Sequence, residues 1–401
     1  MTERFDVIVA GAGMVGACAA LSFSRCGFRT ALIEPRPPLD DIDPVDASYD
    51  LRVSAISPLS QHILSKLGVW PALDQSRVEH YHQMAIWHEN GEANITFDSV
   101  ELARDSLGAI VENRQILRAL LAACEAQSTI EWFRPDAIEL LQENSDQNLR
   151  VTLKSGVEIE SDLLVAADGR NSNTRSLAGI DAWNGSYDQI AIVANLVTEL
   201  PHQHTAWQRF LKTGPLAFLP LANGESSIVW SCDTELAEEI LKMNDQPFCD
   251  AVGQALEYRL GAVTATSDRL SFPLSWHSCN RWLKNRILLI GDAAHGVHPL
   301  AGQGVNLGFS DVDVLIDMIG DLSRPWNQRK LRQFERQRKS ETTLATHLFT
   351  GLKWLYGSDN PVLNRLRNSA MQCVQASPWS KRLLMKQAIQ NMALNHLIPK
   401  L

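Results

Sequence analysis

Two glycine-rich segments carry the residues whose types and spacing could do chemistry. The longer one, GDAAHGVHPLAGQGVNLG, runs from Gly291 to Gly308 and holds five glycines, two histidines and a single carboxylate. It lies between an apolar run, Ile287 to Ile290, and an apolar-periodic segment that begins near Asn306. A strand, a glycine turn and a helix start at this spacing bring unpaired backbone N–H groups together, which suits a flat or anionic ligand. We expect a cofactor-binding turn here, and an ordinary glycine-rich turn is the alternative.

The shorter segment, GAGMVG, lies near the N-terminus, between the β-branched run Phe5 to Ala10 and a stretch with small and apolar residues at helical spacing. It fits the pattern G-x-G-x-x-G. In that pattern Gly11 makes a tight turn, Gly13 lets a pyrophosphate approach the backbone and Gly16 lets helix and strand pack closely. A second strand ends at Glu34, 18 residues after Gly16, where a carboxylate accepts from ribose hydroxyls. The combination predicts a bound adenine dinucleotide.

Three further charged residues lie where expected elements begin or end. Arg52 follows an acidic loop and enters an apolar segment, so its partner is either a phosphate or flavin, or a local carboxylate such as Asp50. Arg114 stands in the first turn of an expected helix that ends near Gln127, and it points either at a cofactor phosphate or at solvent. Asp168 follows a buried strand at the carboxyl edge of the sheet, where ligands bind. Asp-Gly is also an ordinary turn pair, so both interpretations of Asp168 stay open.

The elements that would position these residues change in kind along the chain. From about Trp183 the pattern becomes strand-like, with Gly, Pro, Asn and Asp between the runs and no helix among them. This pattern predicts an antiparallel sheet that could form one wall of a substrate pocket. The four runs are Ile190 to Val197, Thr205 to Leu211, Leu216 to Leu221 and Ser226 to Cys232, and two earlier ones are Tyr81 to Trp87 and Ala93 to Phe97.

Composition limits what the chain can be. Its 401 residues exceed one average core, and 45% apolar content suits a well-packed globule. Seven cysteines without a CxxC pair indicate reduced thiols and a cytoplasmic protein rather than a disulfide or zinc framework. Charges ahead of the first apolar run argue against a signal peptide, and no run is long enough to span a bilayer.

The net charge of −9 hides an asymmetry. Residues 1–323 hold 23 Lys and Arg against 43 Asp and Glu, a net charge of −20, whereas residues 324–401 hold 14 against 3, a net charge of +11. An acidic body makes nucleic acid a poor candidate ligand. The basic C-terminal helices either pack onto the body with a charged outer face or contact an anionic membrane or an acidic partner.

Three motifs together resemble the FAD motifs of the class A flavoprotein monooxygenases. They are GAGMVG with Glu34, the run ADGRNSNTR from Ala167 to Arg175, and the Gly291 to Gly308 segment. Four shorter phrases are similar to those of the bacterial ubiquinone-biosynthesis hydroxylases: LRVSAIS, LGVW, IVEN and GPLAFLPL. The resemblance implies an α/β fold with an FAD-binding Rossmann-like domain of the GR2 type, an interleaved antiparallel β-sheet substrate domain and a helical C-terminal region. The expected bounds are 1–70, 100–180 and 280–325 for the FAD-binding domain, 71–99 and 181–279 for the substrate domain, and 326–401 for the basic C-terminal region.

The resemblance also implies roles for individual residues. The first glycine turn would bind the ADP pyrophosphate, Glu34 the adenosine ribose, and Asp292 the ribityl chain or phosphates, while the helix start after Gly302 would border the flavin ring. The whole expected cofactor set is Gly11, Gly13, Met14, Val15, Gly16, Glu34, Arg52, Arg114, Asp168, Gly291, Asp292, Pro299, Gly302, Gln303, Gly304, Val305, Asn306 and Leu307. Phe218, Pro220 and Leu300 are expected in the substrate wall, and His298 with Pro299 in the flavin and substrate environment; core packing and a structural histidine are the alternatives. No metal is expected.

The activity that the resemblance implies is hydroxylation of a phenolic ring. NAD(P)H would reduce FAD transiently, oxygen would form a flavin C4a-hydroperoxide, and one oxygen atom would pass to a polyprenylated phenol or quinol of ubiquinone biosynthesis. The chain would be cytoplasmic and would contact the inner face of the cytoplasmic membrane, or biosynthetic protein partners, through its basic C-terminal region. The alternatives are a related flavoenzyme for a soluble aromatic or prenyl substrate and a non-catalytic FAD-binding scaffold; the halogenase branch is disfavoured because no W-x-W-x-I-P segment occurs.

Overall fold

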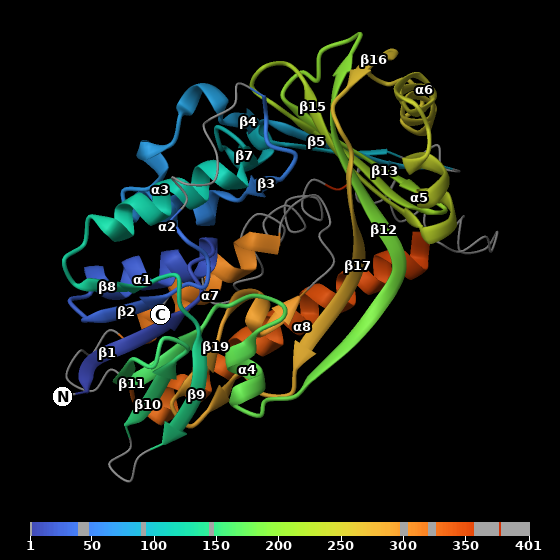
Figure 1. The fold of residues 1–401 in the computed structure, drawn as a ribbon. Coiled ribbons are helices and arrows are strands. Elements are labelled where there is room, and N and C mark those ends of the chain that lie inside the picture. Colours follow the sequence, from blue (N-terminus) through green and yellow to red (C-terminus); the bar gives the residue numbers. More distant parts are fainter. Residues whose placement is uncertain are drawn as a thin grey trace.

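The computed structural model describes residues 2–38, 48–89, 94–143, 148–296, 304–319, 326–356 and 377. Two large sheets and one small sheet account for its strands (Figure 1). The helices of the described ranges include none long and apolar enough to cross a bilayer. The six cysteines in these ranges are free, as expected, and Cys373 lies outside them.

The first sheet has eight strands and a parallel centre. The first strand lies between two parallel neighbours, so that Val9 is opposite both Leu32 and Val165. Such strands are covered on both faces, which explains their unbroken apolar sequences. The order is β18 (Leu283–Lys284), β19 (Ile287–Leu289), β11 (Glu158–Ala166), β1 (Glu3–Ala10), β2 (Thr30–Ile33) and β8 (Ile130–Phe133), with β10 (Leu149–Leu153) and β9 (Ile138–Glu143) continuing from β11.

Helices α1 (Met14–Arg25), α3 (Asn113–Glu125), α7 (Gly304–Ile319) and α8 (Gln328–Tyr356) belong to this part of the molecule. α1 contacts both α3 and α7, and α8 contacts α7. Leu331 and Phe334 of α8 are buried in the same core as β1 and α1. The first half of α8 is therefore part of the body, whatever the rest of the basic C-terminal region does.

The second sheet has nine strands and is covered on its outer face by α5 (Thr234–Leu241) and α6 (Asp245–Ala255) (Figure 1). Its order is β20 (His295–Gly296), β17 (Leu270–Cys279), β12 (Ala182–Thr198), β15 (Ser226–Asp233), β14 (Gly214–Pro220), β13 (Thr205–Leu211), β5 (Gln83–His88) and β6 (Asn94–Asp98), with β16 (Val263–Thr266) beside β12.

The four runs from Ile190 to Cys232 pair antiparallel, as predicted, whereas the earlier strand β5 joins the sheet parallel to β13. β5 comes from an earlier segment of the chain, so no hairpin fixes its direction against β13.

A small antiparallel sheet joins the two large ones. It consists of β3 (Val53–Ile56), β7 (Gly108–Glu112) and β4 (Glu79–Tyr81). β4 pairs with β7 across one of the expected domain boundaries, and the boundaries themselves stay a prediction. The remaining elements are α2 (Pro58–Lys66), α4 (Asn173–Leu177) and the 3-10 turns η2 (Trp70–Ala72), η3 (Gln75–Arg77), η4 (Ser99–Leu102) and η5 (Gly291–Ala293).

Candidate active site

The first glycine turn has the geometry that a dinucleotide needs. Gly11 has φ +93°, and a Cβ added to it would lie 2.7 Å from the Ala167 carbonyl oxygen. A Cβ at Gly16 would lie 1.9 Å from the Gly11 carbonyl oxygen, so both positions require glycine. At Gly13, which is the N-cap of α1 without a side-chain cap, a Cβ would meet nothing within 4 Å. The N-terminus of α1 is thus open to an incoming phosphate, and these residues fit FAD.

Glu34 stands at the end of β2, beside this turn. One carboxylate oxygen accepts a hydrogen bond from the backbone N–H of Ala12 at 2.7 Å, and the other accepts from Nε of Arg36 at 2.7 Å. The side chain is buried, with 9% of its surface exposed. Glu34 is therefore fixed against the glycine turn, and its role at the ribose stays a prediction.

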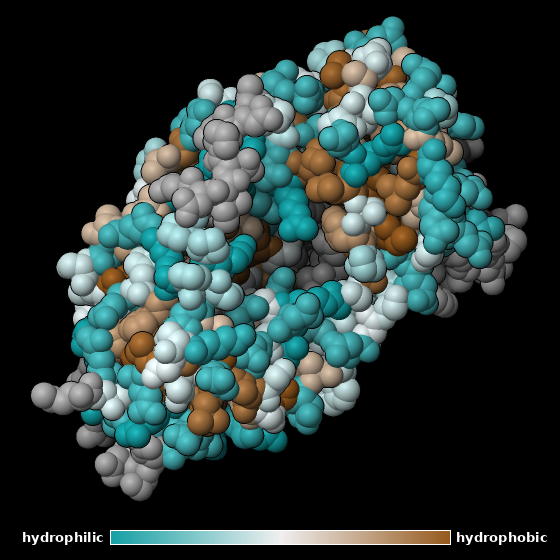
Figure 2. Space-filling view, in the orientation of Figure 1, coloured by the Kyte–Doolittle hydropathy of each residue, from teal (hydrophilic) through white to brown (hydrophobic). Residues whose placement is uncertain are grey.

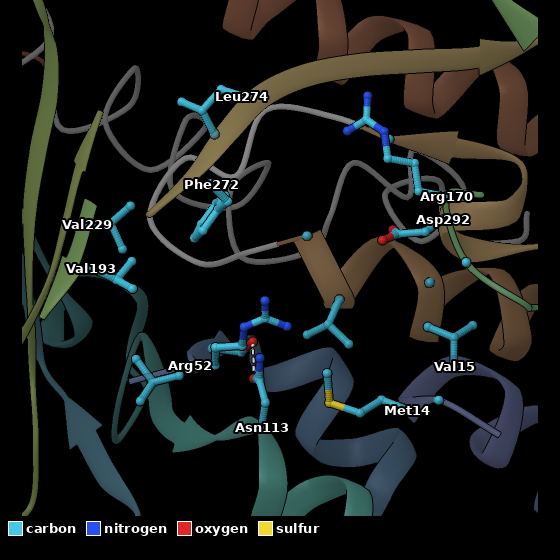
Figure 3. Close-up of a pocket in the computed structure, with 18 of the residues that line it drawn as sticks. Met14, Val15, Arg52, Asn113, Arg170, Val193, Val229, Phe272, Leu274 and Asp292 are labelled. Atoms are coloured by element: carbon cyan, nitrogen blue, oxygen red, sulfur yellow. Dashed lines mark hydrogen bonds between the residues drawn. The ribbon is translucent and has the colours of Figure 1, made fainter. Parts of the chain in front are cut away.

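The second glycine segment packs tightly against the first. A Cβ at Gly291 would lie 3.1 Å from Val15, and one at Gly308 would lie 2.4 Å from the same side chain. Asp292, which follows Gly291, turns its carboxylate towards an open pocket (Figure 3). The Asp292 side chain is exposed to this pocket. The protein that surrounds the pocket nevertheless desolvates the carboxyl group and raises its pKa.

The pocket is a cavity of about 490 Å³ between the two large sheets. Its polar side carries Arg52, Asn113, Arg170 and Asp292, and its other side is apolar (Figure 3). The apolar wall comes from β12, β15 and β17 and includes Val193, Val229, Phe272 and Leu274, with Ser227 and Ser275 of the same strands beside them. Figure 2 shows the hollow, with hydrophobic side chains gathered on the side of the nine-stranded sheet. The cavity can accept a polar cofactor on one side and an apolar substrate on the other.

The structure brings some of the expected residues to this cavity and leaves others away from it. Those that line it are Gly13, Met14, Val15, Arg52, Asp292, Gly304 and Val305. Phe218 is 1% exposed and belongs to the core under α5 and α6, and Pro220 is also buried, so neither lines the cavity. His298, Pro299, Leu300, Gly302 and Gln303 lie outside the described residues.

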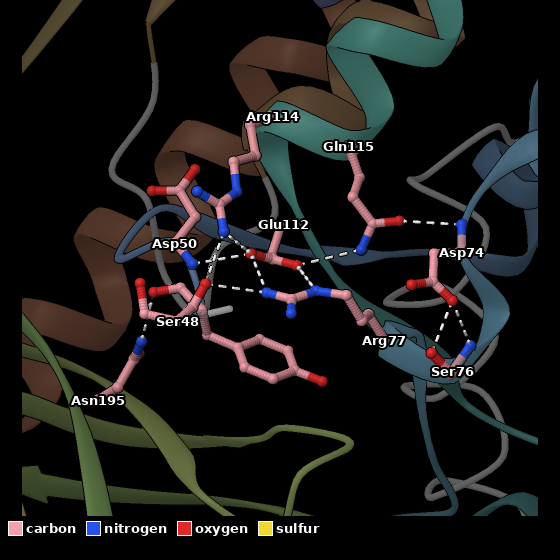
Figure 4. Close-up of polar contacts among 10 residues, drawn as sticks. Ser48, Asp50, Asp74, Ser76, Arg77, Glu112, Arg114, Gln115 and Asn195 are labelled. Carbon is pink, nitrogen blue, oxygen red and sulfur yellow. Dashed lines mark hydrogen bonds and ion pairs between the residues drawn. The ribbon is translucent and has the colours of Figure 1, made fainter. Parts of the chain in front are cut away.

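Arg52 and Arg114 differ in their partners, although a cofactor phosphate was one of the expected alternatives for each. The Arg52 guanidinium points into the cavity (Figure 3), and within the described ranges no hydrogen bond or ion pair holds it. Asp50 accepts from the backbone N–H of Arg52 at 3.1 Å, so the expected local pairing exists at the backbone alone. Arg114 instead pairs with Glu112 at 3.0 Å and donates to the Ser48 carbonyl at 2.6 Å (Figure 4).

Arg114 belongs to what we call the Glu112 network, formed by Arg77, Glu112, Arg114 and Gln115 (Figure 4). Glu112 also accepts from the backbone N–H of Asp50 at 2.7 Å. Burial alone would raise the pKa of Glu112, but Arg77, Asp50 and Gln115 donate to the carboxylate and hold the pKa below its ordinary value. The network fixes the segment that leads into Arg52.

Asp168 and Asn306 are also occupied by the protein itself. Asp168 accepts from the hydroxyl of Ser172 at 2.5 Å and from the backbone N–H of Thr174 at 2.9 Å, which holds the start of α4. Asn306 accepts from the N–H of Ser57 at 3.0 Å and donates to the Ala55 carbonyl at 2.8 Å. Asn306 therefore ties the first turn of α7 to β3, the strand that follows Arg52.

The sequence did not reveal the fully buried group that we call the α8 network, formed by His295, Asp311, Arg338 and Glu341. Nε of Arg338 donates to Asp311 at 2.6 Å, and both side chains are 0% exposed. The other Asp311 oxygen accepts from the backbone N–H of Gly291 at 2.9 Å and contacts Nε2 of His295 at 2.8 Å. Arg338 also pairs with Glu341. The network thereby joins α8 to the residue beside Asp292.

Charge balance explains how Asp311 stays ionised in a dry core. Burial alone would raise its pKa, but Arg338, His295 and the Gly291 N–H lower it to about 2. A signal for this group existed in the sequence. Asp311 lies one turn from both Leu307 and Leu315, on the apolar stripe of α7, where a carboxylate requires a buried partner.

His277 of β17 is a second missed residue of the pocket. Its Nε2 donates to the backbone carbonyl of Asp292 at 2.7 Å. Burial lowers its pKa to about 4, helped by Arg170 and Arg175. A neutral imidazole in this place holds the Asp292 turn against the nine-stranded sheet.

Known proteins resemble this chain over nearly its full length. The FAD binding domain family matches residues 4–346. The mitochondrial ubiquinone biosynthesis monooxygenase COQ6 of Danio rerio is 33% identical over 435 residues, which cover 96% of this chain and 89% of that protein. The 3-demethoxyubiquinol 3-hydroxylase of Escherichia coli (strain K12) is 32% identical over 391 residues, covering 96% and 98%.

A solved structure shows the same fold. The crystal structure of p-nitrophenol 4-monooxygenase PnpA from Pseudomonas putida DLL-E4 matches with a TM-score of 0.76 and 16% identity, covering 98% of this chain and 99% of that one. The predicted fold class and family are confirmed, and FAD is the cofactor. The chain belongs to the class A flavoprotein monooxygenases, in the family of the FAD-dependent ubiquinone-biosynthesis hydroxylases.

Proposed function

We propose that this enzyme hydroxylates the aromatic ring of a polyprenylated phenol or benzoquinol intermediate of ubiquinone biosynthesis, using NAD(P)H and oxygen. The names of the two relatives support this substrate class. The observation that carries the proposal is the two-sided cavity, which joins the FAD side to an apolar wall. A ring with a hydrocarbon substituent suits such a wall better than a charged soluble aromatic does.

The residues that would hold FAD follow from the geometry. The α1 N-terminus with Gly11, Gly13 and Gly16 would bind the pyrophosphate, and Glu34 the adenosine ribose. Arg52 would pair with a phosphate, because its guanidinium points into the cavity without a protein partner in the described ranges. Asp292 would bond the ribityl chain. At Gly304, where α7 begins, a Cβ would meet nothing within 4 Å, so the flavin ring can approach this helix end.

FAD, once reduced by NAD(P)H, supplies the chemistry that splits oxygen and adds one of its atoms to the phenolic ring. The N-terminus of α7 presents roughly half a positive charge, which would stabilise negative charge on the ring. The wall of Val193, Val229, Phe272 and Leu274 would exclude water, which otherwise diverts the oxygen into hydrogen peroxide. His277 would act as a positioning residue, because it holds the Asp292 backbone.

The test uses the FAD-loaded enzyme, NADH or NADPH, ¹⁸O₂ and a short-chain prenyl phenol. We expect one labelled oxygen atom in the hydroxylated ring, and prenyl-dependent consumption of the reductant. The matched control is the same phenol without its prenyl chain. If reductant is consumed equally with either phenol and all oxygen appears as hydrogen peroxide, the substrate assignment is wrong. Extraction of quinone intermediates from cells lacking the protein would identify the ring position.

We also propose that the C-terminal region brings the enzyme to an anionic membrane, where a polyprenyl substrate resides. The support is the +11 charge of residues 324–401. Much of this region, including Lys381, Arg382 and Lys386, lies outside the described residues. Deleting the whole region is a poor test, because Arg338, Leu331 and Phe334 are buried in the body.

Charge reversal tests the membrane proposal without removing α8. The variant K381E/R382E/K386E is expected to bind anionic vesicles more weakly at low salt, with its FAD content unchanged. The control K66E/K154E/K242E changes the charge equally at three exposed positions of the acidic body. Equal vesicle binding by the two variants would refute the proposal.

A further inference from the structure

Glu79, His202 and His204 meet where the small sheet touches the nine-stranded sheet. Glu79 is the first residue of β4, and the two histidines immediately precede β13. One potential ligand atom from each residue lies within 4.8 Å of those of the other two. The histidines are brought together by a tight turn, in which Gln203 and His204 have φ values of +54° and +51°. None of the three lines the cavity described above.

His202 is oriented as metal-binding histidines are. It is 6% exposed, and its Nε2 lies 3.1 Å from the Leu221 carbonyl oxygen. A carbonyl can only accept, so Nε2 carries the proton and Nδ1 holds the lone pair. Metal-ligating histidines commonly donate their second N–H in this way, which fixes the tautomer.

The other two residues place a carboxylate and a second imidazole beside it. Nδ1 of His204 lies 2.5 Å from Glu79, whose side chain is 9% exposed, whereas the His204 side chain is 60% exposed. Nδ1 of His202 accepts from the His204 backbone N–H at 3.1 Å, and a metal bound at this nitrogen would replace that hydrogen bond. Among the described residues, no lysine or arginine pairs with Glu79. A nearly buried carboxylate beside two imidazoles favours a bound cation.

We propose that Glu79, His202 and His204 form a binding site for a divalent transition-metal ion of the zinc type. Two imidazole nitrogens and one carboxylate suit zinc, whereas magnesium and calcium prefer ligand sets of oxygen alone. Zinc bonds of about 2.0–2.1 Å in a tetrahedron place neighbouring ligand atoms about 3.4 Å apart. Binding would therefore separate Nδ1 of His204 from Glu79, which lie 2.5 Å apart, and release the His204 N–H from His202. Solvent would complete the coordination, because His204 is exposed.

The ion would connect β4 of the small sheet to the start of β13. These elements already pack together through a shared apolar cluster that includes Tyr81, Ala206 and Leu221. A metal that binds the folded state alone stabilises it by mass action. We therefore expect the ion to raise thermal stability and to leave the flavin chemistry unchanged, and this inference does not depend on the identity of the substrate.

The test is a zinc titration of the tag-free, FAD-loaded enzyme after treatment with a chelator. Calorimetry should show one zinc ion per chain, and zinc should raise the Tm. His204→Ala and Glu79→Gln should each weaken zinc binding at least tenfold and abolish the rise in Tm. FAD content and circular dichroism check that both variants are folded, which we expect because His204 is largely exposed and glutamine matches glutamate in size.

The matched control is His62→Ala, which removes an exposed histidine of α2 and should leave zinc binding unchanged. Magnesium at the same concentration should produce neither heat nor a Tm shift. Three outcomes would overturn the proposal: no stoichiometric zinc binding, equal affinity in His204→Ala and the parent enzyme, or an equal response to magnesium. If Glu79→Gln binds zinc as tightly as the parent enzyme does, the carboxylate is not a ligand, and the proposed ligand set is also wrong.

Discussion

The α8 network and the Glu112 network lie beside the pocket and solve the same problem in different environments. Each uses arginine to hold a carboxylate that in turn fixes the backbone near a residue that we propose to bind FAD, Asp292 in one case and Arg52 in the other. In the α8 network Asp311 and Arg338 are completely buried. In the Glu112 network the carboxylate is buried, but Arg77 and Arg114 are 17% and 23% exposed.

This difference determines how much the loss of each residue should destabilise the protein. A dry ion pair that loses one partner leaves an uncompensated charge, whereas solvent can partly replace a lost partner at a site that it reaches. Glu112 also has several donors, so the remaining donors still hold the carboxylate when one of them is removed. The α8 network should therefore behave as a single unit, and the Glu112 network as a set of replaceable contacts.

The largest effect is expected for Arg338→Met. Methionine keeps an unbranched stem but leaves Asp311 buried without its counter-ion, which should lower the free energy of unfolding by about 3–5 kcal/mol. FAD content should also fall, because the Gly291 N–H is held by the same carboxylate. Denaturant unfolding and the ratio of flavin to protein measure both effects. The double variant R338M/D311N should recover part of the stability, and a single variant as stable as the parent would contradict the comparison.

The second-largest effect is expected in the dependence of the free energy of unfolding on pH. The pKa of Asp311 is lowered to about 2 in the folded protein, against about 3.9 in the unfolded chain. A depressed carboxylate pKa contributes stability above the unfolded value, and that stability is lost as pH falls from about 4 to about 2. The contribution is about 2.5 kcal/mol. Denaturation curves between pH 7 and pH 3 should show about half of this loss in the parent enzyme, and Asp311→Asn should lack that component.

Glu112→Gln should have a smaller effect, about 1–2 kcal/mol, because an amide still accepts some of the hydrogen bonds and the arginines can reach water. Denaturant unfolding measures it. The control is Glu125→Gln, which removes the carboxylate of an exposed pair with Arg134 and should change stability by less than about 0.5 kcal/mol. If Glu112→Gln destabilises as much as Arg338→Met, exposure of the arginines does not distinguish the networks.

The smallest effect on stability is expected for Arg52→Gln. Its guanidinium faces the cavity, so the free energy of unfolding without FAD should change by less than about 0.5 kcal/mol. The affinity of the Arg52→Gln enzyme for FAD should fall about tenfold, or about 1.4 kcal/mol, because the variant lacks the charged contact that we propose between Arg52 and an FAD phosphate. Flavin fluorescence titration measures this. Lys154→Gln, at an exposed position, is the control and should leave FAD affinity unchanged.

The features predictable from sequence were those encoded locally. The turn at Gly11, Gly13 and Gly16 is one case, and the runs that became β13 and β15 are another, because glycine conformation and strand periodicity act over a few residues. The sequence offered ligand binding or an ordinary turn for Asp168, and a cofactor phosphate or solvent for Arg114. The structure instead gives each of them a nearby protein partner, Ser172 and Thr174 for Asp168 and Glu112 for Arg114, because short-range side-chain pairs of this kind leave no distinct sequence pattern. Arg338 was hidden for a different reason: its partner lies 27 residues away, and the charges of α8 resemble a solvated face.

The connection between β19 and β20 has a consequence for protein engineering. β19 pairs within the eight-stranded sheet, β20 pairs with β17 of the nine-stranded sheet, and η5 with Asp292 lies between them. His277 of β17 also holds the Asp292 carbonyl. A chimera that exchanges the nine-stranded sheet with a relative would therefore have to inherit residues 270–296 as one block. A crossover between His277 and Asp292 would place parts of different parental origin on the two sides of the turn that carries Asp292.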